Sequence, residues 1–202
     1  MKLTDLHTLF EDQLKDLYSA EKQLIQALPK MAKRASHPDL TEAFESHLEE
    51  TRGHADRLTA LGDTLEIKLG GKKCKAMEGL IEEGKEMLEA EGPESIIDAG
   101  LIGAAQRVEH YEIAAYGTAR AMAEQLGLKE AVEVLQGILD QEGAADKKLT
   151  EIALGSILPN TNADDESDDG NNSRKNPGND RNTKAGAPAS PRKETARTSR
   201  VQ

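Results

Sequence analysis

The sequence predicts an all-α protein, a bundle of four long helices arranged as two helical hairpins with a short extra helix in the crossover between them. Ala and Leu supply most of the apolar side chains, while the 202 residues include only two Phe, three Tyr and no Trp. Such a composition favours helices over a sheet core. Apolar residues also recur every three or four positions along most of the chain, and segments with Gly or Pro interrupt the pattern. Together these observations indicate helices joined by short turns.

Each expected helix follows from its periodicity and its ends. The first shows the clearest stripe, at Leu6, Leu9, Phe10, Leu14, Leu17, Leu24, Ile25 and Leu28. Pro38 and Pro93 suit the first turns of later helices, and Gly127 marks the turn before the last one. The expected helices run over about residues 5–35, 38–65, 74–91, 93–126 and from after Gly127 to about Ala153.

Charge and composition divide the chain into a helical domain, 1–159, and a polar tail, 160–202. The tail's only apolar residues are five Ala and one Val, so it cannot bury enough surface to offset its ordering entropy, and we expect it to be disordered. Residues 1–159 hold 30 of the 37 acidic and 18 of the 26 basic residues, a net charge near −12. This charge argues against nucleic-acid binding, except for a weak, salt-sensitive contact through the basic end of the tail.

The segment before the first helix and the cysteine content bear on location. The N-terminus alternates charged with apolar residues and shows neither the apolar stretch of a signal peptide nor a membrane span. Cys74 is the single cysteine, which excludes an intramolecular disulfide. We therefore expect a cytoplasmic protein without a membrane partner.

The two hairpins repeat one acidic layout. Glu21 is followed 29 residues later by Glu50, and Glu112 is followed 30 residues later by Glu142. A second potential ligand lies one turn after the second acid of each pair and points to the same side of the helix. It is His54 after Glu50 and Asp146 after Glu142. Glu109 is an alternative to Glu112 as the ligand from its helix. The candidate metal ligands are thus Glu21, Glu50, His54, Glu112, Glu142 and Asp146.

Neighbouring apolar residues place most of these acids on the inner faces of their helices. Buried carboxylates without partners cost several kcal/mol each, and no Lys or Arg occupies a matching inner position. Two divalent cations would neutralise these buried carboxylates. Carboxylate oxygens with an imidazole suit iron or manganese, and this arrangement is typical of dinuclear sites in helical bundles.

Four segments resemble the YciE/YciF group of ferritin-like bacterial stress proteins: "DLYSAEKQLIQALPKMA" (16–32), "HLEETRGHADRL" (47–58), "VEHYEIAAYGTA" (108–119) and "LDQEGAADKKL" (139–149). The resemblance covers roughly residues 3–158. It implies a ferritin-like bundle, a homodimer, a dinuclear metal site formed by the six candidate ligands, and a role in stress response. Asp146 stands where the wider ferritin-like pattern has a second His, which makes the site harder and raises manganese as an option.

Two functions follow from this reasoning. One is a non-haem dinuclear metalloprotein that oxidises Fe(II) or consumes peroxide or dioxygen. The other is a non-catalytic helical stress protein or binding module that holds metal passively. Among the remaining residues, His47 and His110 are expected to be half-exposed, Cys74 to be an inert surface thiol, and Tyr18 and Tyr116 to be core tyrosines that could donate hydrogen bonds to ligating carboxylates.

Overall fold

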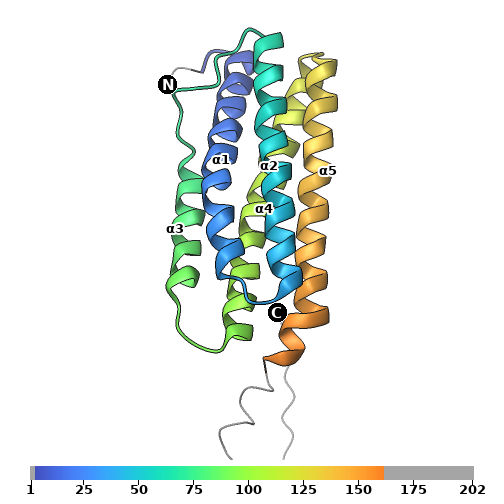
Figure 1. Ribbon diagram of the computed structural model, residues 1–202. Coiled ribbons are helices and arrows are strands. Elements are labelled where there is room, and N and C mark those ends of the chain that lie inside the picture. The colour runs from blue at the N-terminus through green and yellow to red at the C-terminus, as the bar shows by residue number, and fades with distance from the viewer. Residues whose placement is uncertain (1–2, 162–202) are drawn as a thin grey trace, which may run out of the picture. The chain divides into compact units, whose positions relative to one another are not determined.

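The computed structural model describes residues 3–161, and all their regular elements are helical. The elements are α1 (Leu6–Arg34), α2 (Pro38–Thr64), α3 (Lys75–Glu89), α4 (Glu94–Gln125) and α5 (Lys129–Ile152), then a π-helical turn (Ala153–Ile157) and a 3₁₀ turn (Leu158–Asn160). Helices α1 and α2 form one hairpin and α4 and α5 the other, while α3 packs against α1 and α4 (Figure 1). The predicted all-α fold class is confirmed. The predicted disordered tail at 160–202 lies outside the described residues from 162 onward.

The helix ends use the signals visible in the sequence. The side chain of Asp5 caps α1, since its Oδ1 accepts a hydrogen bond of 2.8 Å from the backbone N–H of Thr8. Pro38 is the first residue of α2, and Pro93 directly precedes α4. Gly127 adopts a φ of 72° between α4 and α5, a left-handed conformation that glycine reaches without steric cost. These local signals fix where the helices start and turn.

Asp98 of α4 anchors the turn of the first hairpin. It is buried, and its carboxylate accepts hydrogen bonds from the backbone N–H groups of Ser36 and His37, both at 2.9 Å, and from the Ser36 hydroxyl at 2.7 Å. Both oxygens are thereby satisfied. The same contacts tie the α1–α2 turn to the other hairpin.

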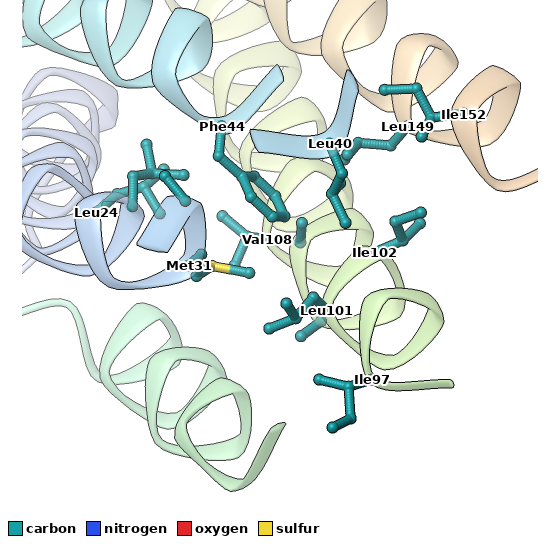
Figure 2. Close-up of a cluster of buried hydrophobic side chains, with 14 of the residues drawn as sticks. Leu24, Met31, Leu40, Phe44, Ile97, Leu101, Ile102, Val108, Leu149 and Ile152 are labelled. Carbon is teal, nitrogen blue, oxygen red and sulfur yellow. The ribbon is translucent and has the colours of Figure 1, made fainter. Parts of the chain in front are cut away.

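Two apolar clusters fill the bundle, one towards each end. The first includes Leu24, Leu40, Phe44, Leu101 and Ile152, several of which converge in Figure 2. The second includes Phe10, Leu14, Leu58, Tyr116 and Leu135. Burial of these side chains is the main stabilising contribution, at roughly 1.5–3 kcal/mol for each large one. None of the described helices combines the length and the apolar character needed to cross a bilayer.

Cys74 is buried rather than on the surface, so that prediction was wrong. It caps α3, and its Sγ lies 3.4 Å from the backbone nitrogen of Met77 and 2.9 Å from the hydroxyl of Tyr111. Burial raises the pKa of the thiol. The packing of α3 on α1 and α4 covers the sulfur.

Candidate metal centre

A layer of polar side chains separates the two apolar clusters. On α1, Glu21 lies between Leu17 of one cluster and Leu24 of the other, and the same order recurs on the other three long helices. Each of the four long helices contributes to the layer, and its side chains are buried. Its members are Glu21 from α1, His47 and His54 from α2, Glu109 and Glu112 from α4, and Glu142 from α5.

These six side chains form two groups whose potential ligand atoms converge. In one group His47, Glu109, Glu112 and Glu142 each offer an atom within 4.8 Å of the others, and in the second group Glu21, His54 and Glu142 do so. Glu142 belongs to both. Its Oε1 lies 2.8 Å from Nδ1 of His54, and its Oε2 lies 3.8 Å from Nε2 of His47. One carboxylate therefore faces both groups, one oxygen towards each.

The layer contains buried polar atoms that nothing satisfies. Nine buried side-chain nitrogen and oxygen atoms in the described part of the chain have no hydrogen-bond partner, and all nine belong to these six residues. His54 Nδ1 and Glu142 Oε1 are close enough for an ion pair, but not in hydrogen-bond geometry. Each unsatisfied buried group costs roughly 1–3 kcal/mol, more if it is charged. The carboxylate of Asp98 is also buried, but it accepts three hydrogen bonds. The unpartnered carboxylates of the layer therefore differ from a buried acid whose role is structural.

The electrostatics of the layer reflect burial and crowding of like charges. Burial raises the pKa of Glu21, and burial together with the charges of Glu142 and Glu21 raises that of Glu112 well above its ordinary value. For Glu109, burial raises the pKa to about 8 despite the opposing charge of His47. Within the described residues, the ion pairs of these acids involve only the two histidines.

The two histidines take up part of this negative charge. Burial alone would lower the pKa of His47, but the Glu109 charge and the hydrogen bond to Glu50 outweigh it and raise the pKa to about 9. Burial likewise opposes protonation of His54, and its contacts with Glu142 and Glu21 raise the pKa to about 9. Without another cation, the layer thus retains protons at neutral pH.

Two residues hold potential ligands in place from outside the groups. Tyr116, fully buried, donates a hydrogen bond from its hydroxyl to Glu21 Oε1, as the sequence suggested. Glu50 Oε2 lies 3.4 Å from His47 Nδ1, and this hydrogen bond lowers the pKa of Glu50. An ionised carboxylate only accepts, so His47 donates from Nδ1 and directs Nε2 towards Glu109 and Glu142.

A family model described as a domain of unknown function, DUF892, matches residues 5–162. The chain belongs to this family. Protein YciF of Escherichia coli strain K12 is 45% identical over 158 residues, which are 78% of this chain and 95% of that protein. The resemblance noted in the sequence is therefore confirmed.

Solved structures of similar proteins support this family membership. The crystal structure of the E. coli stress protein YciF matches with a TM-score of 0.75 and 44% identity, over 77% of this chain and 99% of that one. The YcfI protein of Rhodopseudomonas palustris matches with a TM-score of 0.72 and 40% identity, over 74% and 95% of the two chains.

In this DUF892 chain, four of the six residues predicted as ligands lie in the two groups: Glu21, His54, Glu112 and Glu142. Glu109, predicted as an alternative to Glu112, lies beside it in the same group. His47 was expected to be half-exposed, which was wrong, because it is only 6% exposed and belongs to the first group. The signal that could have identified it is its spacing of seven residues from His54, two turns along one helix face.

Glu50 and Asp146 are outside both groups. Around the axis of an ideal helix, two residues four positions apart point in directions about 40° apart. Two residues seven positions apart differ by only about 20°. Glu50 is therefore turned by about 40° from His54 and by about 60° from His47. It lies at the edge of the buried face, with 38% of its side chain exposed. Asp146 Oδ1 instead accepts a hydrogen bond of 3.0 Å from Gln106 and lies 3.3 Å from His110 Nε2. His110 has 70% of its side chain exposed.

Proposed function

We propose that this chain is a ferritin-like stress-response protein with a carboxylate-bridged dinuclear site for iron or manganese. The observation that carries the proposal is the set of nine unpartnered buried atoms, all on six residues that carry only nitrogen and oxygen ligands. Carboxylate and imidazole ligands without a thiolate suit these two metals. The stress-protein description of the YciF structure supports the biological role.

Charge balance favours two ions over one. The layer holds four carboxylates, Glu21, Glu109, Glu112 and Glu142, and two imidazoles that are neutral when they act as ligands. Four negative charges are neutralised by two divalent cations, whereas one would leave a net charge of −2 in a buried site. His47, Glu109 and Glu112 would hold one ion, Glu21 and His54 the other, and Glu142 both.

The function that this site would support is oxidation of Fe(II), or consumption of peroxide or dioxygen. When bound, the metal pair supplies the redox equivalents for this chemistry. The protein contributes the arrangement around it. Tyr116 holds Glu21, Glu50 directs His47, and the apolar clusters enclose the layer towards the two ends of the bundle. We further propose that the chain forms a homodimer, as the family resemblance implies, and that it is cytoplasmic. Small-angle scattering would test the assembly.

The test is elemental analysis of protein purified without chelators, followed by assays of Fe(II) oxidation and peroxide consumption. We expect two ions per chain and many turnovers per chain in at least one assay. Two ions without turnover would favour the alternative, a protein that holds metal passively. Retention of fewer than two ions after reconstitution with excess Fe(II) or Mn(II) would contradict the dinuclear site.

A further inference from the structure

A pocket of about 380 Å³ lies between α2 and α5 and reaches the metal-binding layer. At its mouth are Asp39, Glu42 and Lys148, all exposed, while His47 and Glu109 line it and are buried. Glu50, half-buried, lies between these extremes. The gradient of burial along the lining residues describes a passage from solvent to one of the two ligand groups.

The pocket has the charge and size for a hydrated cation. Its lining includes four acids, Asp39, Glu42, Glu50 and Glu109, and one lysine, Lys148. Its side walls include small residues from both helices. At about 30 Å³ per molecule of liquid water, 380 Å³ holds about a dozen waters, enough for a divalent ion with its first hydration shell. Peroxide or dioxygen alone would need far less space.

The inner end presents unsatisfied ligand atoms. Nε2 of His47 and Oε2 of Glu109 are buried without hydrogen-bond partners, and both residues line the pocket. Between these atoms and the mouth, the carboxylate of Glu50 accepts a hydrogen bond from Nδ1 of His47. A second pocket, between α1, α3 and α4, is lined mainly by apolar residues and includes no member of the layer.

We propose that divalent cations reach the buried layer through the α2–α5 pocket, attracted by the acids at its mouth and passed by Glu50 to His47 and Glu109. The inference rests on the proposed function, because it requires that the layer bind metal. It adds the route and the class of species that travels along it. Exchange of water ligands for carboxylate oxygens of Glu50 would let the ion lose its hydration shell stepwise.

Stopped-flow measurement of Co(II) uptake by the full-length apoprotein, followed by the visible absorption of the bound ion, tests the route. Glu42→Lys should slow uptake on the order of fivefold at low ionic strength, and Lys148→Glu should accelerate it by a similar factor, because charge at the mouth steers the approaching cation. High salt should abolish both effects. Glu83→Lys is the matched control, an exposed α3 acid away from the pocket, and should change the rate less than twofold.

A steric test is independent of charge. Ala144 is an exposed residue of the pocket wall. The substitution Ala144→Phe should slow Co(II) uptake without changing the number of bound ions. Ala114→Phe on exposed α4 surface is its control. Equal slowing by Glu42→Lys and Glu83→Lys, or no slowing by Ala144→Phe, would overturn the route even with two ions bound. If the unaltered protein bound no Co(II), the proposed function would fail and the route with it.

Discussion

Replacement of Glu142 by leucine is expected to abolish binding of both metal ions. Glu142 is shared by both ligand groups, with one oxygen 2.8 Å from His54 Nδ1 and the other 3.8 Å from His47 Nε2. Loss of a hydrogen bond to a ligand typically costs about 10–100-fold in metal affinity. Loss of a ligand to two ions should cost each more than about 100-fold. Replacement of Glu112 by leucine removes a ligand from one group only, so we expect one ion to remain.

The same substitution should stabilise the metal-free protein. Glu142 is fully buried and both its oxygens lack hydrogen-bond partners, so an apolar side chain of similar size removes a penalty. Replacement of a whole buried ion pair by apolar residues is often neutral or stabilising, by about 1–4 kcal/mol. The same sign is expected here because His54 keeps its contact with Glu21, and His47 and His54 can each release a proton instead of remaining as unpaired buried charges. Urea unfolding in the presence of EDTA would measure the gain, and added Mn(II) should stabilise the unaltered protein but not the variant.

Asp98→Leu is the matched control, because Asp98 is an equally buried acid in the same bundle. Its three hydrogen bonds to Ser36 and His37 would be lost and their donors left unsatisfied, so we expect a loss of more than about 3 kcal/mol. Metal stoichiometry should stay at two. Equal destabilisation by the two substitutions in EDTA would show that Glu142 is a structural acid like Asp98.

The sequence predicted the helices because their causes are local. An apolar stripe, a proline in a first turn and a glycine after a last turn act over a few residues, and the observed ends lie within about two residues of those expected. The exposure of Cys74 depended instead on α3 packing against α1 and α4, which no neighbouring residue reveals.

The candidate site was predicted in part for the same reason. Periodicity shows which face of a helix is buried, and this identified Glu21, Glu112 and Glu142. Which of several polar residues near that face meet in the interior depends on how the helices are rotated against one another. Asp146 illustrates this, since its partners Gln106 and His110 come from another helix. Whether a residue could be a ligand or could position one, as proposed for Glu50 and His47, also needs the three-dimensional arrangement.

The metal-free protein is expected to lose stability as pH rises from about 4.5 to about 9. The pKa values of Glu21, Glu109 and Glu112 are raised above 4.5 in the folded state, mainly by burial, so above pH 4.5 the folded protein keeps protons that the unfolded chain releases. His47 and His54, raised from 6.5 to about 9, extend the effect: their stabilising contribution is complete below pH 6.5 and is lost as pH rises through 9. For each proton that the folded state holds in excess of the unfolded state, the free energy of unfolding falls by about 1.4 kcal/mol as the pH rises by one unit.

Bound metal should reverse the sign of this dependence. Ligands must be deprotonated to coordinate a cation, so the loaded protein releases the protons that the metal-free form retains, and its stability should increase with pH between 4.5 and 7. Glu50, whose pKa is lowered, would add to stability only as pH rises to about 4.5, and so does not obscure this window. Urea unfolding at several pH values, in EDTA and in excess Mn(II), measures both slopes. Parallel slopes in the two conditions would contradict the metal centre, because the same buried carboxylates and imidazoles must exchange their protons for metal if they are its ligands.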